Sequence, residues 1–186
     1  MKSALLLSFL LVGCVGGLIP PPAPAVHWFS LDRTRSVETV NESSSAVSVH
    51  LDSVREAAHL SDRLVRRISD VEFIVHGDTH WVEAPSRVLE RGLRRVLFEE
   101  RGMVADPLGD SVALSCELVS LEEDRRNAPV ARVVLHLELS RNHRLIRAKT
   151  LIREVSITSP KIEATAHAMG EALEQAIAGV ADWVSL

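Results

Sequence analysis

Residues 111–157 decide the fold, and they read SVALSCELVSLEEDRRNAPVARVVLHLELSRNHRLIRAKTLIREVSI. Apolar and polar residues alternate along most of this stretch, which is typical of strands that bury one face. The alternation predicts three strands, over residues 111–121, 130–140 and 144–157. The apolar face of each strand is assigned to Val112, Leu114, Cys116 and Leu118, to Ala131, Val133, Leu135, Leu137 and Leu139, and to Ile146, Ala148, Thr150 and Ile152.

Two short connections set the order of these strands in the sheet. Residues 122–129 (EEDRRNAP) predict a charged, exposed hairpin loop, and residues 141–143 (RNH) predict a tight turn. Strands joined by such short connections are antiparallel neighbours. The stretch therefore predicts an antiparallel meander.

Upstream of the meander, the chain alternates short strand-like segments with polar connections. Residues 27–31, 47–51, 64–68 and 71–75 predict four strands, and Gly77-Asp78 indicates a turn.

Two segments have the apolar spacing of helices. Residues 82–101 predict a helix with Pro85 in its first turn and Gly102 as its stop. A longer helix follows the meander, with Ser159 as its cap and Pro160 at its first position. Its buried stripe is assigned to Ile162, Ala166, Met169, Leu173, Ala176, Ile177, Val180 and Val184. The order β-β-β-β-α-β-β-β-α predicts one layered α/β (α+β) domain over residues 27–186, with two main helices packed on a mixed, mostly antiparallel sheet.

Composition narrows the classes of function. The chain has 186 residues and a net charge of −4, with basic and acidic residues interspersed, so no basic patch indicates nucleic acid. Tyrosine is absent and aromatic residues make up 4%, which argues against an aromatic sugar-binding platform. The cysteines number two and have no zinc-ligand spacing. Cys116 lies in an alternating segment, which predicts a buried free thiol.

The N-terminus has the pattern of an export signal. A lysine at position 2 precedes an apolar run that ends in Leu11-Val12-Gly13-Cys14. This motif resembles a bacterial lipoprotein signal, which implies a leader over residues 1–13 and a Cys14 that bears diacylglycerol and an N-acyl (palmitate-type) chain. An ordinary secretory leader is the alternative. A spanning anchor is disfavoured, since the run is about half the length that crosses a bilayer. Residues 14–26, rich in Gly and Pro, predict a lipidated tether.

Three groups of residues are candidate sites. His76, Asp78 and His80 lie within five residues and could bind a metal ion. A polar turn is the simpler interpretation, because no second His/Asp cluster supports a catalytic site. Arg91, Arg94 and Arg95 form a basic stripe for a partner or for headgroups, or else a solvated face. Trp81 and Trp183 are either partner contacts or core residues. The carboxylates at 122–124 are assigned to a solvated turn, and no nucleophile elbow is present.

Taken in order, several segments resemble one family. They are Trp28-Phe29, Val47-Ser48-Val49, residues 59–67 (HLSDRLVRR), residues 80–85 (HWVEAP) and Asp182-Trp183-Val184, behind the Cys14 motif. The chain thereby resembles the ABC-type transport auxiliary lipoproteins, the PqiC-like family. It departs from the family pattern at His59, where the family has Tyr, and at Ser61, which is inserted.

The resemblance implies a non-enzymatic lipoprotein on the periplasmic face of the outer membrane, a location that Val15 after Cys14 also favours. It implies no cofactor, an ABC permease and ATPase and an MCE-domain protein as partners in lipid transport, and self-association as a homo-oligomer. Two alternatives remain open: an activator of a periplasmic cell-wall enzyme, and a metal-dependent hydrolase that uses His76, Asp78 and His80.

Overall fold

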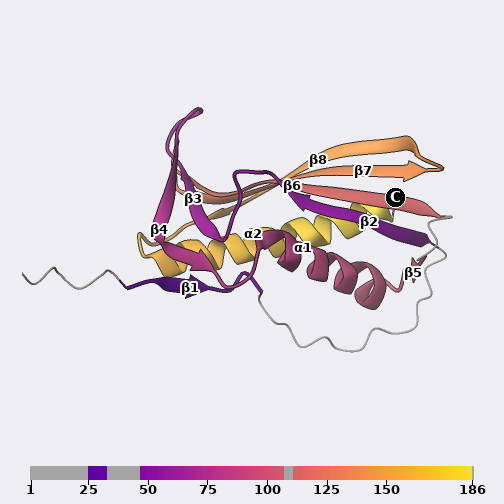
Figure 1. The fold of residues 1–186 in the computed structure, drawn as a ribbon, viewed down its shortest axis with the longest axis horizontal. Helices are drawn as coiled ribbons and strands as arrows, with labels where there is room; N and C mark the ends of the chain where they lie inside the picture. The colour runs from indigo at the N-terminus through magenta and orange to yellow at the C-terminus, as the bar shows by residue number, and fades with distance from the viewer. Residues whose placement is uncertain (1–24, 33–46, 107–110, 186) are drawn as a thin grey trace, which may run out of the picture.

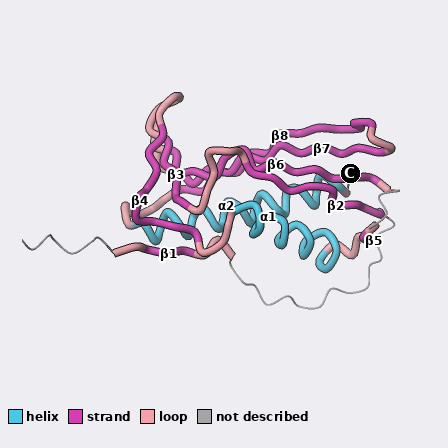
Figure 2. Tube along the Cα trace, in the orientation of Figure 1, coloured by secondary structure: helices cyan, strands magenta, loops and turns pink. Residues whose placement is uncertain are grey.

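The computed structural model describes residues 25–32, 47–106 and 111–185, so the leader, Cys14 and most of the tether lie outside the described residues. The strands form one eight-stranded mixed sheet, and the helices lie together on one of its faces (Figures 1 and 2). The elements in chain order are β1 (His27–Phe29), β2 (Ser48–Glu56), β3 (Arg63–Arg67), β4 (Phe73–Trp81), α1 (Pro85–Arg94), the π-helical η1 (Arg95–Glu100), β5 (Val104–Ala105), β6 (Val112–Asp124), β7 (Val130–Arg141), β8 (Arg144–Ser156) and α2 (Ile162–Val184). The predicted α+β class is confirmed.

Strand β6 is the centre of the sheet. One of its edges pairs with β7, which pairs with β8, and this is the predicted antiparallel meander. Its other edge is shared: β2 pairs parallel to the first part of β6, and β3 pairs parallel to its end. Strand β3 continues into the antiparallel hairpin with β4, and β1 lies parallel to β4.

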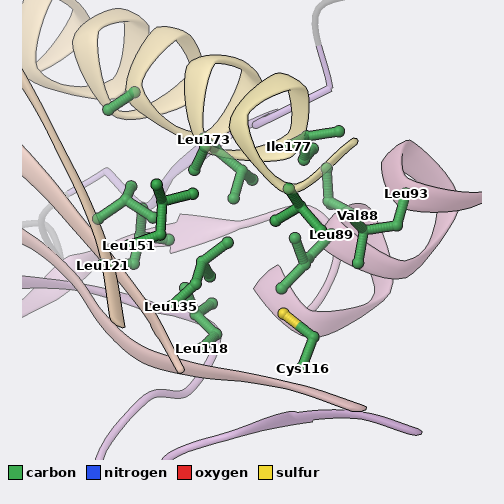
Figure 3. Packing of buried hydrophobic residues seen from close by; sticks show 14 of the residues in the cluster. Val88, Leu89, Leu93, Cys116, Leu118, Leu121, Leu135, Leu151, Leu173 and Ile177 are labelled. Atoms are coloured by element: carbon green, nitrogen blue, oxygen red, sulfur yellow. The ribbon is translucent and has the colours of Figure 1, made fainter. Parts of the chain in front are cut away.

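The core lies between the sheet and the two helices. Leu118, Leu135 and Leu151 lie side by side on β6, β7 and β8 and face α2, where Leu173 and Ile177 are buried (Figure 3). The predicted stripe of α2 is confirmed, because seven of its members are buried and Ile162 is partly buried against them: Ala166, Met169, Leu173, Ala176, Ile177, Val180 and Val184.

A glycine allows the two helices to approach each other. A Cβ atom at Gly92 of α1 would lie 2.5 Å from Cδ1 of Ile177, so a side chain there would force the Ile177 side chain to move.

The helix boundaries differ from the prediction in three places. Helix α1 begins at Pro85, because residues up to Trp81 continue β4; Gly77-Asp78 is therefore part of a strand and is not a turn. The helix changes to π-helix at Arg95, and Gly102 ends it with a φ of 61°. Helix α2 begins at Ile162, and Ser159 does not cap it; the Ser159 hydroxyl instead accepts a hydrogen bond from the Lys161 amide.

Two predictions about the meander are wrong. Residues 122–124 are not an exposed loop: they extend β6 and are buried. In β8 the buried face contains Leu151, while Ile146 and Ile152 are 50% and 43% exposed. The reason is a β-bulge next to the turn. The two-residue turn of Asn142 (φ 50°) and His143 (φ 59°) pairs Arg141 with Arg144 and Ser140 with Leu145, but the register then shifts by one residue, so that Leu139 pairs with Arg147. This register places the odd-numbered residues of the middle of β8 on the helix side.

Candidate interaction surfaces

A group of ion pairs joins β3 to the end of β6. Arg67 Nε lies 2.6 Å from Glu122 Oε1, and Arg66 Nε lies 2.7 Å from Glu123 Oε2. Both carboxylates are almost completely buried, at 1% and 0% exposed. Arg125 also contacts Glu123, at 2.5 Å. These pairs are the reason that three consecutive acidic residues can continue a buried strand, since burial of an unpaired charge is costly.

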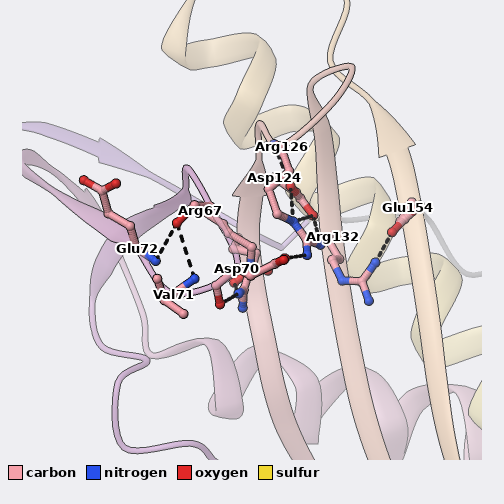
Figure 4. Close-up of polar contacts among 10 residues, drawn as sticks. Arg67, Asp70, Val71, Glu72, Asp124, Arg126, Arg132 and Glu154 are labelled. Atoms are coloured by element: carbon pink, nitrogen blue, oxygen red, sulfur yellow. Dashed lines mark hydrogen bonds and ion pairs between the residues drawn. The ribbon is translucent and has the colours of Figure 1, made fainter.

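The group continues onto the β3–β4 turn (Figure 4). Arg126 donates hydrogen bonds to Asp124 and, at 2.6 Å, to Asp70 Oδ1. Hydrogen bonds from Arg126 lower the pKa of Asp124 to about 2, against the opposing effect of burial. Asp124 is thus ionised at neutral pH and bound by Arg126, as in a structural ion pair.

The three candidate metal ligands, His76, Asp78 and His80, lie on β4. His80 Nδ1 lies 2.9 Å from Asp62 Oδ2, and its ring stacks on Trp28 at 4.8 Å. The hydrogen bond with His80 lowers the pKa of Asp62. Burial and the charge of Arg66 lower the pKa of His76. Within the described ranges, the structure brings together no group of three His, Cys, Asp or Glu residues that could hold a metal ion.

The predicted basic stripe is largely neutralised by carboxylates. Arg91 donates two hydrogen bonds to Glu83, at 2.7 and 2.9 Å, and a third to Asp32. The hydrogen bond with Arg91 lowers the pKa of Glu83. Arg94 pairs with Glu90 in the next turn of α1, and Arg95 pairs with Glu100. The stripe is therefore a set of surface ion pairs rather than an uncompensated cationic face.

The two candidate tryptophans are core residues. Trp81 and Trp183 are 2% and 5% exposed, which agrees with the core-packing alternative and leaves little of either side chain for contact with a partner. Arg147 of β8 lies over the Trp183 ring at 5.0 Å and covers it.

Cys116 is a buried free thiol, as predicted. Burial raises the pKa of this thiol to about 12, so it is protonated at neutral pH and is a poor nucleophile.

Sequence reasoning missed the surface formed by β8. Within the described chain, β8 pairs only with β7, so no other strand pairs with its outer edge along these 13 residues. Leu145, Ile146 and Ile152 are exposed along it. The strand also contains four cationic residues, Arg144, Arg147, Lys149 and Arg153. The alternation had placed Ile146 and Ile152 in the core, which concealed this surface.

A second missed surface is the β3–β4 hairpin, which projects away from the sheet (Figure 1). Val71 in its turn is 90% exposed, and Ile68, Phe73, Ile74 and Val75 around it are also exposed. The sequence signal was the run Phe73-Ile74-Val75, which is continuous where a half-buried strand would alternate.

Comparison with solved structures shows that the chain shares its fold with other proteins. No family model matches the sequence, and no curated protein matches it. Protein XCC0632 from Xanthomonas campestris, assigned to family DUF330, superposes with a TM-score of 0.70 at 20% identity, over 84% of this chain and 93% of that protein. The chain shares the fold of XCC0632.

Two other solved structures are similar to the chain. An uncharacterized protein matches with a TM-score of 0.63 at 14% identity, over 87% of this chain and 99% of its own. Hypothetical protein CT253 from Chlamydia trachomatis matches with a TM-score of 0.52 at 10% identity, over 75% of this chain and 95% of its own. The domain therefore corresponds to nearly the whole of each of these proteins.

Among the described residues, no helix has both the length and the apolar character needed to cross a membrane.

Proposed function

We propose that this protein is a lipoprotein anchored through Cys14 to the periplasmic face of the outer membrane, where it serves an ABC/MCE-type lipid-transport system by docking and not by catalysis. Three observations support the proposal. The motif that ends in Cys14 resembles a lipoprotein signal, the ordered segments resemble the transport auxiliary family, and the domain has the fold of a DUF330 protein.

The free edge of β8 is the observation on which docking depends. Long, flat, apolar edge strands promote unwanted pairing, and proteins usually shorten or cover them. An edge of 13 residues with exposed Leu145, Ile146 and Ile152 is instead well formed to accept a strand from a partner. Its arginines and lysine favour a partner strand with acidic side chains. The MCE-domain protein is the expected partner, together with the permease and ATPase, and a second copy of the chain is another.

The docking role is tested with Ile152→Asp in the full lipidated protein. We expect recovery of the MCE-domain protein by co-purification to fall at least tenfold, because an aspartate removes an apolar contact and repels the acidic side chains expected on the partner strand. Val82→Asp is the matched control, since Val82 is exposed but lies between β4 and α1. Undiminished recovery with Ile152→Asp would contradict docking through β8. Preferential capture of a cell-wall synthase would favour the activator alternative, and a stoichiometric bound metal would favour the hydrolase.

The anchor is tested separately with Cys14→Ala. We expect the variant to incorporate no palmitate analogue and to leave the outer-membrane fraction, because the acylated sulfur and N-terminus are lost. Normal labelling of this variant would contradict the lipoprotein assignment.

A further inference from the structure

The β3–β4 hairpin has apolar side chains on both of its faces. Successive residues of a strand point to opposite sides, and Phe73, Ile74 and Val75 are consecutive. All three are between two-fifths and one-half exposed. A strand that docks on a protein surface needs only one apolar face. A hairpin that is apolar on both faces is better matched by a medium that surrounds it.

Charged residues at the base of the hairpin limit the length of its apolar part. At its base, Arg66 and Arg67 pair with Glu123 and Glu122. The Arg67 guanidinium lies 4.1 Å from the centre of the Phe73 ring, so the cation and the aromatic ring meet at the same level. Such an arrangement of apolar tip, aromatic ring and arginines is typical of segments at the membrane–water interface.

The turn itself contains two acidic residues, which limit how deep it can go. Asp70 pairs with Arg126 at 2.6 Å, so its charge is compensated. Glu72 is exposed next to Val71. A carboxylate in the turn is compatible with the headgroup layer but not with the hydrocarbon centre. The contact is therefore shallow, as for interfacial segments that enter about 5–10 Å.

The tether can bring the lipid anchor and the hairpin to the same bilayer. His27 at the start of β1 pairs with Thr79, six residues along β4 from Phe73, which corresponds to about 20 Å. The 13 residues from Cys14 to Val26 span up to about 45 Å when extended. The hairpin is thus within reach of the surface that holds the acyl chains.

We propose that the tip of the β3–β4 hairpin, formed by Ile68, Val71 and Phe73, inserts into the interfacial layer of the bilayer to which Cys14 is anchored. Ile74 and Val75 pair with Arg66 and Val65 and face the outer edge of that layer. The proposal rests on the lipid anchoring proposed above. The anchor alone would leave the domain free to rotate on its tether. A second contact through the hairpin fixes the orientation of the domain and with it the direction in which the β8 edge faces.

The test places a polarity-sensitive fluorophore on Val71→Cys in the lipidated protein, reconstituted into vesicles of phosphatidylethanolamine with a minor share of phosphatidylglycerol. Cys116 does not compete for the label because it is buried and its pKa is raised. Asn142→Cys, in the exposed β7–β8 turn, is the matched control site. We expect a blue shift and quenching by brominated acyl chains at position 71, and neither at position 142.

The other outcomes separate this proposal from the anchor. Protein that stays on the vesicles while the label at position 71 remains in water would overturn hairpin insertion and leave the anchor intact. A shift that occurs only after the MCE-domain protein is added would assign the hairpin to a protein partner and overturn insertion. Protein that does not associate with the vesicles would overturn both the anchor and the insertion.

Discussion

At the residue scale, the buried carboxylates at the end of β6 are the least expected feature of the molecule. Glu122 is 1% exposed and depends on Arg67 for compensation of its charge. We predict that Glu122→Gln lowers the free energy of unfolding by about 3 kcal/mol, because removing one partner leaves the other charge poorly solvated. Urea unfolding followed by circular dichroism measures this difference.

Glu90→Gln is the control for that variant. Glu90 pairs with Arg94 on the exposed side of α1, and such pairs stabilise a helix by only about 0.3–0.5 kcal/mol. If Glu122→Gln and Glu90→Gln lowered the free energy of unfolding by equal amounts, the structural role given to the β3–β6 ion pairs would be contradicted.

Asp124 makes stability depend on acid pH. Its pKa is about 2 in the folded protein, below the ordinary value of 3.8, so the unfolded chain binds the proton more readily. Its contribution is therefore fully present well above pH 3.8 and is lost as the pH falls toward 2. We predict that Asp124→Asn reduces the steepness with which the melting temperature falls between about pH 4 and pH 2. If the melting temperature of Asp124→Asn fell with pH as steeply as that of the unmodified protein, the role given to Asp124 would be contradicted.

At the element scale, the sequence predicted some faces correctly and others wrongly for identifiable reasons. The alternation is regular in β6 up to Leu118 and throughout β7, and the buried residues there, from Leu114 to Leu118 and from Ala131 to Leu139, are those predicted. In β8 both Leu151 and Ile152 are apolar, so periodicity does not distinguish the two faces, and the one-residue register shift between Ser140 and Leu139 decides which of them is buried. The burial of the acidic residues at the end of β6 could not be predicted from the local sequence, because it depends on arginine partners on β3 that are more than 50 residues away.

The positive φ angle of His143 in the β7–β8 turn leads to a separate prediction. His143 has a φ of 59°, a conformation that costs a non-glycine residue about 1 kcal/mol. We predict that His143→Gly stabilises the domain by about 0.5–1 kcal/mol, because Asn-Gly is the preferred sequence of this turn type. Gly102, at a φ of 61°, gives the opposite case: Gly102→Ala is expected to lower the melting temperature. Thermal unfolding of both variants checks the pair, and a loss with His143→Gly would contradict the turn assignment.

At the scale of the whole molecule, the class of fold could be predicted but the topology of the sheet could not. The order of strands and helices indicated one α+β layer structure, and the structure confirms it. The sharing of one edge of β6 between β2 and β3 depends on pairings between distant segments, for which no local pattern exists. The exposed hairpin and the free β8 edge, which matter for function, follow from that topology.

The whole domain makes the last prediction. The buried apolar core extends from Leu31 to Val184, and β1 begins at His27, so no described core residue lies in the leader or tether. We predict that a chain beginning at Val26 folds without lipid and unfolds cooperatively on heating, with the circular dichroism of a mixed α+β protein. The lipidated full-length protein in detergent is the control, and the two melting temperatures should agree within about 3 °C, because all the core residues that the structure describes are kept in the shorter chain. A truncated chain that is unfolded would show that the anchor or tether is needed for folding. That result would contradict the division of the molecule into a membrane anchor and a docking domain that folds independently.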